Sequence, residues 1–91
     1  MGDPGSGWEI IFAPRAEKEL RRVPGAMRIR LLNAIEALVT RPPSGDVRKL
    51  QGFDNEWRLR VGEWRVRFTY DEAQHQVHIL RVSQRGQAYR D

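Results

Sequence analysis

Four arginines alternate with apolar side chains in the segment EWRLRVGEWRVRFTY, residues 56–70. They are Arg58, Arg60, Arg65 and Arg67. Because successive side chains of a β-strand point to opposite faces, all four arginines would share one face of a sheet. Guanidinium groups bind phosphates and carboxylates through paired hydrogen bonds and also stack on bases. The pattern therefore predicts an anion-binding surface for RNA, DNA or an acidic protein segment.

The glycine at position 62 determines how these arginines pair. In a two-residue hairpin loop that starts at Gly62, Arg60 lies opposite Arg65. Two residues further from the loop, Arg58 lies opposite Arg67. Like charges directly opposite each other destabilise a sheet by about 0.2–1 kcal/mol per pair, and a bound anion would remove this repulsion. The alternative is a solvated face, on which arginine stems cover apolar surface and nearby acids reduce the repulsion.

Length and composition limit the classes of protein to which this chain can belong. Because the chain has 91 residues, we expect one domain at 8–91, preceded by a Gly/Pro-rich leader at 1–7. The net charge of +4 favours anionic partners. The chain has no cysteine, which excludes disulfides, thiolate zinc sites and cysteine nucleophiles. Because the sequence also shows no membrane-spanning run and no signal peptide, we expect a cytoplasmic protein without a membrane partner.

The periodicity of apolar residues changes along the chain. We expect a strand at 8–12, a helix that begins at Pro14, a longer helix from about 26 to 40, and strands at 56–61, 64–70 and 76–82. This β-α-α-β-β-β order predicts a two-layer α+β domain, in which a helical hairpin packs against a small, largely antiparallel sheet.

The last expected strand is apolar at both even and odd positions. Val77 and Ile79 occupy odd-numbered positions, and Leu80 and Val82 occupy even-numbered positions. In a regular strand these two pairs would point to opposite faces. We therefore expect a central strand with both faces at least partly covered.

In order and spacing, four segments resemble the RelE/ParE superfamily of bacterial toxins from type II toxin–antitoxin systems. They are PRAEKELRRVP, RKLQG, EWRLRVGEWRVRFTYD and ILRVSQRGQAY, and the likeness covers about residues 8–90. The resemblance implies a RelE-like fold. It also implies one of two activities. The RelE-like branch enters the ribosomal A site and cuts mRNA by attack of a 2′-hydroxyl on the adjacent phosphate, whereas the ParE-like branch inhibits DNA gyrase.

The resemblance also assigns roles to basic residues and to one tyrosine. By position, the implied catalytic residues are Arg60, Arg65, Arg85 and Tyr89, and the implied RNA-binding residues are Arg48, Lys49, Arg58 and Arg67. Arg65 and Arg85 would stabilise charge on the phosphorane, an effect of about 100- to 1,000-fold per group in other enzymes. Tyr89 could instead stack on a base. From the residues alone, the segment RGQAYR, residues 85–90, is equally well a solvated tail whose tyrosine packs on the sheet edge.

The sequence departs from the ribonuclease branch in two respects. Arginine occupies both sites where that branch often has a lysine that takes the 2′-hydroxyl proton, and Gln84 occupies the site where many relatives have histidine. Arginine stays protonated and is a poor general base. Glu56, Glu63 and Tyr89 are the remaining proton acceptors. We therefore favour a ribosome-dependent endoribonuclease, with a gyrase inhibitor or an inactive binding module as alternatives.

The two histidines and the expected partners complete the sequence-based predictions. His75 in a turn and His78 on a strand would not face one another, so we expect structural roles and no metal site. No cofactor is expected. The resemblance implies two partners: an antitoxin encoded beside the toxin, and mRNA on the ribosome.

Overall fold

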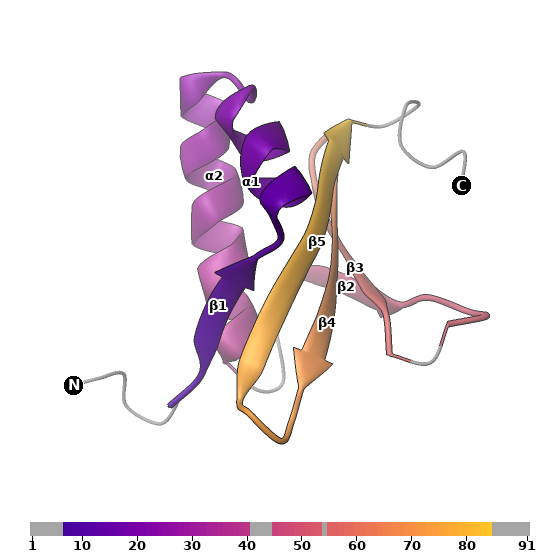
Figure 1. Cartoon of the computed structure of the whole chain (residues 1–91). Coiled ribbons are helices and arrows are strands. Elements are labelled where there is room, and N and C mark those ends of the chain that lie inside the picture. Colours follow the sequence, from indigo (N-terminus) through magenta and orange to yellow (C-terminus); the bar gives the residue numbers. More distant parts are fainter. Residues whose placement is uncertain (1–6, 41–44, 54, 85–91) are drawn as a thin grey trace.

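The computed structural model describes residues 7–40, 45–53 and 55–84. Its elements follow the chain in the order β1 (Glu9–Phe12), α1 (Pro14–Arg21), α2 (Gly25–Glu36), the 3₁₀ turn η1 (Ala37–Val39), β2 (Asp46–Lys49), β3 (Trp57–Val61), β4 (Trp64–Asp71) and β5 (Gln76–Gln84) (Figure 1). In these ranges no helix is long and apolar enough to cross a membrane.

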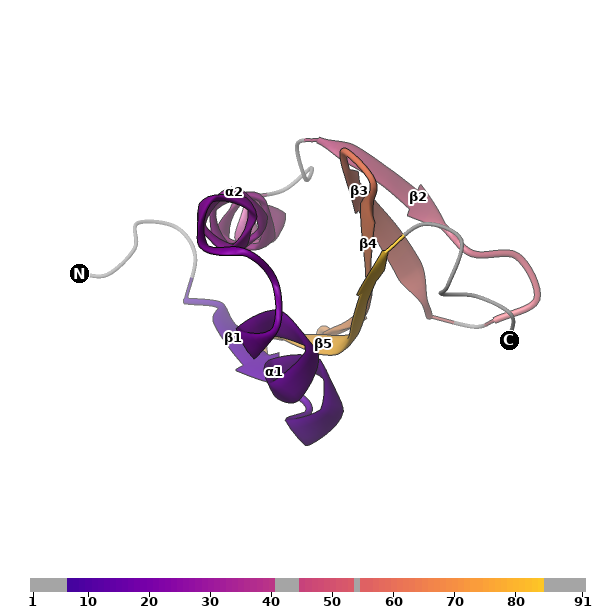
Figure 2. The ribbon, with the colours of Figure 1, turned by 90° about the horizontal axis from the view of Figure 1, so that it is seen from above.

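One five-stranded sheet forms the second layer of the molecule. The strand order is β1-β5-β4-β3-β2; β1 is parallel to β5, and the other pairs are antiparallel. Both helices lie on the same face of this sheet, as the view in Figure 2 shows. The predicted α+β class, with a helical hairpin on a largely antiparallel sheet, is therefore confirmed.

The helices begin and end where local chemistry requires. Pro14 occupies the first turn of α1, where its missing N–H leaves no hydrogen bond unmade. Pro24 and Gly25 separate the two helices, and Arg28 Nη2 donates to Val23 O over 3.1 Å across this break. The final turn of the predicted second helix is the tighter 3₁₀ turn η1.

The hydrophobic core fills the space between the helices and one face of the sheet. Its buried helix-side residues are Ala16, Leu20, Val23, Leu31, Ile35 and Leu38, and its sheet residues are Leu59, Val66, Phe68, Tyr70, Val77, Ile79 and Val82. The Tyr70 hydroxyl donates to Leu38 O over 3.0 Å, so this buried phenol has a partner. Burying these apolar side chains leaves the other face of the sheet available for polar residues.

The hairpin register predicted from Gly62 is confirmed. Arg60 pairs with Arg65 and Arg58 pairs with Arg67. Gly62 has φ +59°, and no other residue of the two-residue loop has positive φ, as in a type II′ turn. The turn thus places both pairs of arginines side by side on neighbouring strands.

The sequence-based prediction missed one strand. β2 pairs in antiparallel fashion with β3 and forms an edge of the sheet. Three of its four residues are charged, and Val47 is its single apolar side chain. A charged edge strand of this length has no clear apolar alternation. Its existence depends on pairing with β3, which the local pattern does not reveal.

The last strand is central, as predicted, because β5 lies between β1 and β4, but its apolar residues do not divide between the two faces by even and odd positions. Phe68 pairs with Ile79 while Arg67 pairs with Arg81, so Leu80 is an extra residue in a β-bulge. Beyond the bulge, the alternation of side chains between the two faces of the sheet is shifted by one residue. Val82 therefore joins the core with Ile79, and Leu80 lines a recess on the opposite face.

Candidate anion-binding site

The sheet face opposite the helices carries six arginines, which we call the arginine face. Its members are Arg48, Arg58, Arg60, Arg65, Arg67 and Arg81. A continuous row runs across β2, β3, β4 and β5, because Arg48 pairs with Arg58, Arg58 with Arg67, and Arg67 with Arg81. The sequence analysis missed Arg81 as a member, because the bulge at Leu80 decides on which face it lies.

Three of the six arginines on this face form ion pairs with carboxylates of the same chain. The three ion pairs are Arg58–Asp46 at 3.5 Å, Arg67–Glu56 at 2.6 Å and Arg81–Glu19 at 3.1 Å. All three arginine side chains are less than one-quarter exposed. The alternative prediction, that nearby acids reduce the repulsion, is therefore correct for these three arginines. These ion pairs connect the sheet arginines to β2, to the residue before β3 and to α1.

The other half of the arginine face forms no such ion pairs, although Asp46, the partner of Arg58, lies opposite Arg60 in the β2–β3 ladder. Within the described ranges, no carboxylate forms an ion pair with Arg48, Arg60 or Arg65. Arg60 and Arg65 form the cross-strand pair next to the hairpin turn. Two cations on facing positions, with Cβ atoms about 5 Å apart, repel each other until an anion lies between them. This pair is the strongest candidate for binding phosphate.

A buried hydroxyl lies beside this pair. Ser83 is opposite Arg65 in the β4–β5 ladder and is 9% exposed. Its Oγ has no hydrogen-bond partner in the described structure. The hydroxyl is thus an unused donor at a position paired with Arg65, but it is covered and does not reach the surface of the arginine face.

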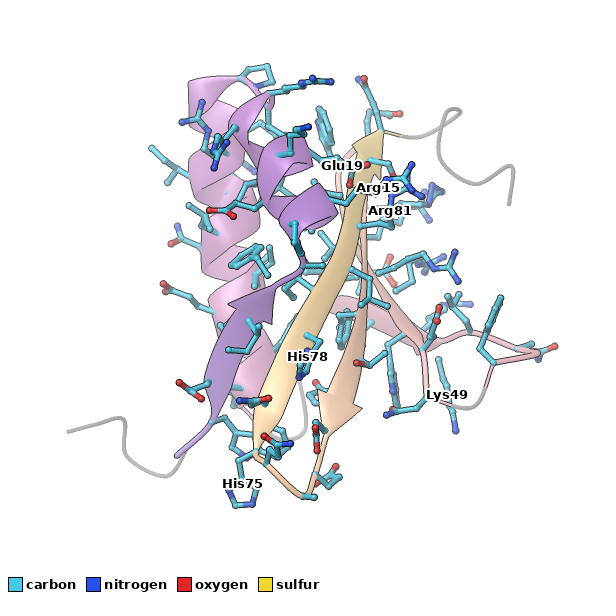
Figure 3. The ribbon with its side chains drawn as sticks, viewed as in Figure 1. Arg15, Glu19, Lys49, His75, His78 and Arg81 are labelled. Atoms are coloured by element: carbon cyan, nitrogen blue, oxygen red, sulfur yellow. The ribbon has the colours of Figure 1, made fainter. Side chains whose placement is uncertain are left out.

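Glu19 connects α1 to the end of β5. Strand β1 pairs with β5 as far as Ile79, and beyond this residue no strand of the described ranges lies on that side of β5. Glu19 Oε1 accepts the Val82 N–H over 2.7 Å, and its Oε2 accepts Arg81 Nε–H over 3.1 Å. Arg15 Nε lies 3.6 Å from the same carboxylate, and Figure 3 shows these side chains together beside β5. This contact fixes the strand from which the chain continues to Arg85.

The remaining predicted site residues are not all on the arginine face. Lys49 pairs with Trp57, so it points to the helix side of β2, whereas Arg48 points to the arginine face. Arg85 and Tyr89 lie outside the described residues. The structure thus brings together five of the eight residues that the resemblance assigned.

The candidate general bases differ in their surroundings. Glu56 Oε1 accepts Arg67 Nη2–H over 2.6 Å and is thereby held in an ion pair. Glu63 is exposed in the hairpin turn, and Tyr89 lies outside the described residues. The geometry therefore gives no described carboxylate that is both near Arg65 and without a cationic partner.

Both histidines lie toward the end of the sheet at the β4–β5 turn, away from Arg81 and Glu19 (Figure 3). His75 stacks on Trp8 with ring centroids 5.0 Å apart, and His78 Nε2 lies 2.9 Å from Gln76 Oε1. Among the described residues no group of His, Asp and Glu side chains is arranged to hold a metal ion.

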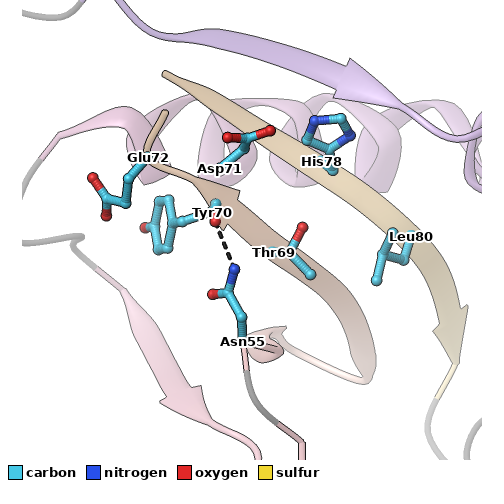
Figure 4. Close-up of a pocket in the computed structure, with 7 residues that line it drawn as sticks. All are labelled: Asn55, Thr69, Tyr70, Asp71, Glu72, His78 and Leu80. Carbon is cyan, nitrogen blue, oxygen red and sulfur yellow. Dashed lines mark hydrogen bonds between the residues drawn. The ribbon is translucent and has the colours of Figure 1, made fainter. Parts of the chain in front are cut away.

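A shallow recess of about 570 Å³ lies beyond the arginines on the same face (Figure 4). Its lining residues are Asn55, Thr69, Tyr70, Asp71, Glu72, His78 and Leu80. Two carboxylates at this end of the sheet repel phosphate. The two signs of charge therefore lie at opposite ends of this face: the cations lie near the hairpin turn, and the acids lie near the β4–β5 turn.

Residues 10–89 match the ParE toxin family of the parDE type II toxin–antitoxin system. The chain belongs to this family, within the RelE/ParE superfamily of toxins. The toxin is 32% identical to Toxin RelE3 of Methanocaldococcus jannaschii over 62 residues, which are 64% of the toxin and 70% of that relative. It is 29% identical over 87 residues to Putative toxin RelE1 of the same organism, covering 92% of the toxin and 97% of the relative.

Solved structures show the same fold. RelE in the archaeal RelE–RelB complex from Pyrococcus horikoshii OT3 has a TM-score of 0.75 and 26% identity, covering 90% of the toxin and 99% of that chain. The isolated E. coli RelE toxin has a TM-score of 0.73 and 19% identity, covering 89% and 87% of the two chains. The RelE-like fold implied by the sequence resemblance is confirmed.

Proposed function

We propose that this toxin is a ribosome-dependent endoribonuclease that cleaves mRNA in the cytoplasm. The observation that carries the proposal is the Arg60–Arg65 pair, which has no carboxylate partner in the described structure and lies where two guanidinium groups can grip one phosphate. The curated relatives that bear the name RelE support the ribonuclease branch.

The proposed reaction is an intramolecular transesterification of RNA. A ribose 2′-oxygen attacks the adjacent phosphorus and loses its proton, while the bond from phosphorus to the 5′-oxygen breaks and that oxygen takes up a proton. The products are a 2′,3′-cyclic phosphate and a 5′-hydroxyl. Arg65, together with Arg85, stabilises the negative charge of the pentavalent phosphorane, and Arg60 holds the phosphate in line for attack.

The proposed catalysis is chiefly electrostatic and positional. Arginine remains protonated and cannot accept the 2′-hydroxyl proton, and Glu56 is held by Arg67. Tyr89, as a phenolate or a hydrogen-bond acceptor, is the remaining candidate in the implied site. General base catalysis contributes about 100- to 10,000-fold, so the toxin is expected to be slower than relatives that have a lysine base.

Replacement of Arg65 tests the proposal directly. In R65A, we expect message cleavage to fall by about 100- to 1,000-fold, because one group that stabilises the phosphorane is lost. The measurement is the mapping of mRNA 5′ ends after brief induction in a bacterial cell. R60A should also lower cleavage, because the phosphate loses half of its clamp.

The matched control is R30A, which removes an exposed arginine from α2, on the opposite side of the molecule. This variant should cleave messages as the wild type does. Full cleavage by R65A in a soluble, folded variant would contradict the assigned site.

We also propose that a cognate antitoxin binds this toxin. Similar solved structures include complexes of RelE with RelB from Pyrococcus horikoshii OT3 and Methanococcus jannaschii. An acidic segment of the partner could neutralise Arg48, Arg60 and Arg65, which lack carboxylates of their own among the described residues. Co-expression with the adjacent gene product should therefore restore growth.

The second candidate function is inhibition of DNA gyrase. The family match to ParE toxins favours it, and so does arginine at both positions where a catalytic lysine is often found. This function predicts gyrase-dependent DNA breaks with intact messages. Scoring DNA breaks and message ends in the same induced cells separates the two functions.

A further inference from the structure

Phe53 is an aromatic side chain that the folded core does not use. It lies in the segment between β2 and β3 and is 50% exposed. Of the described residues, Ile29 is the other large hydrophobic side chain with comparable exposure. A single exposed apolar residue is ordinary on a protein surface. The contacts of Phe53 are what distinguish it.

The ring of Phe53 lies over the guanidinium group of Arg67. The Arg67 Cζ atom is 5.0 Å from the ring centroid, which is the geometry of a cation–π contact. Arg67 is itself fixed, because its Nη2 donates to Glu56 Oε1 over 2.6 Å and its side chain is 14% exposed. One face of the ring is therefore supported by a fixed cation, while half of the side chain remains accessible.

The segment that carries Phe53 is anchored at both ends. The Leu50 N–H donates to Glu56 O over 2.8 Å and closes the segment. Asn55 Nδ2 donates to Tyr70 O over 2.6 Å and ties it to β4 (Figure 4). A ring that is already held in place loses little conformational entropy when a second planar group stacks on it.

The surroundings of the ring favour a nucleobase as that planar group. Proteins that bind single-stranded nucleic acid combine a basic surface, which follows the phosphates, with aromatic side chains on which bases stack. Arg67, beneath Phe53, belongs to the row that leads to Arg48 at the edge strand, where no described carboxylate pairs with it. Asp71, at the far end of β4, repels phosphates, so the path of a polyanion leads across β3 and β2.

We propose that Phe53, supported by Arg67, is a stacking platform for one base of the single-stranded RNA whose phosphates bind Arg48, Arg60 and Arg65. This inference rests on the proposed function and names a further contact to the same substrate. Stacking uses the flat face of the base and not its edge, so the contact strengthens binding without reading the sequence.

The test is binding of a short 2′-O-methyl oligoadenylate, which cannot be cleaved, followed by fluorescence anisotropy. F53A should bind about 5- to 150-fold more weakly than the wild type, because stacking of one base is worth about 1–3 kcal/mol. F53L keeps apolar bulk without a π-face and should lose affinity in the same way. F53W should bind as tightly as the wild type or more tightly.

An abasic oligonucleotide with the same backbone is the matched control. The wild type and F53A should bind it equally, and the salt dependence of oligoadenylate binding should be the same for both, because Phe53 contacts no phosphate. Thermal unfolding of each variant checks that the fold is retained. Equal affinity of F53A and the wild type for oligoadenylate would overturn the inference.

Two further outcomes separate this inference from the proposed function. If F53A loses base-dependent binding but the wild type cuts no message in cells, the platform stands and the ribonuclease proposal fails. If F53A binds RNA normally but binds the antitoxin more weakly, the platform for RNA is overturned and the ring belongs to a protein interface.

Discussion

At the scale of single residues, ion pairing decides which arginines can bind a ligand. Arg58, Arg67 and Arg81 are held by Asp46, Glu56 and Glu19, whereas Arg60 and Arg65 face each other without a carboxylate in the described ranges. An arginine that already shares its charge with a carboxylate of its own chain gains less from an incoming phosphate. Identical residue types on one face thus have two different roles.

Glu19 illustrates a residue whose role is to hold others in place. We expect E19A to lower the free energy of unfolding by about 2 kcal/mol, because it leaves the Val82 N–H and the Arg81 guanidinium without their acceptor. E17A is the matched control, since Glu17 lies on the same helix, is 58% exposed and, among the described residues, forms an ion pair with Arg21 alone, at 3.5 Å.

Urea unfolding of both variants checks this prediction. E17A should change stability by less than about 0.5 kcal/mol. Equal effects of the two substitutions would show that Glu19 contributes no more than an ordinary surface ion pair.

At the scale of elements, the hairpin turn and the bulge set the register of the arginine face. Gly62 starts a two-residue turn that aligns β3 with β4, and the extra residue Leu80 aligns β4 with β5. A register error of one residue would move every arginine of a strand into the core. These two irregular points therefore determine where the cations lie.

Substitution of Gly62 tests the role of the turn. G62A should destabilise the toxin by about 1 kcal/mol, because an L-residue is strained at φ +59°. G25A is the control: that glycine lies in the first turn of α2, and an added Cβ would meet open space. G25A should be neutral or stabilising by about 0.4–1 kcal/mol in the same unfolding experiment.

At the scale of the whole molecule, the two layers separate stability from binding. The helices and one sheet face bury the apolar core, and the other face carries the cations near the hairpin turn and acids near the β4–β5 turn. Three arginines of the arginine face lack carboxylate partners among the described residues, so this face keeps positive charge that the chain does not neutralise. A field of this kind steers an anionic partner to one side of the toxin.

The salt dependence of RNA binding reports this distribution. For single-stranded RNA, each phosphate contact changes the slope of log K against log salt by about 0.7. R48A should reduce the slope by that amount, whereas R81A should leave it unchanged, because Glu19 already holds Arg81. Titrations with the non-cleavable oligoadenylate at several salt concentrations measure both slopes. If R81A had a smaller salt-dependence slope than R48A, the division of the arginine face into arginines with and without carboxylate partners would be contradicted.

The sequence by itself determined the fold class, the helix boundaries near Pro14 and Pro24, and the pairing of Arg60 with Arg65. These features depend on contacts between neighbours in the chain, and periodicity and turn chemistry report such contacts. Only the tertiary structure decided that β2 exists, that Leu80 bulges and that Asp46, Glu56 and Glu19 hold three of the arginines. The contact between Glu19 of α1 and Arg81 of β5 joins segments far apart in the sequence. The pairing of β2 with β3 and the bulge at Leu80 join consecutive strands, but they depend on how those strands pack in the sheet, which no local pattern encodes.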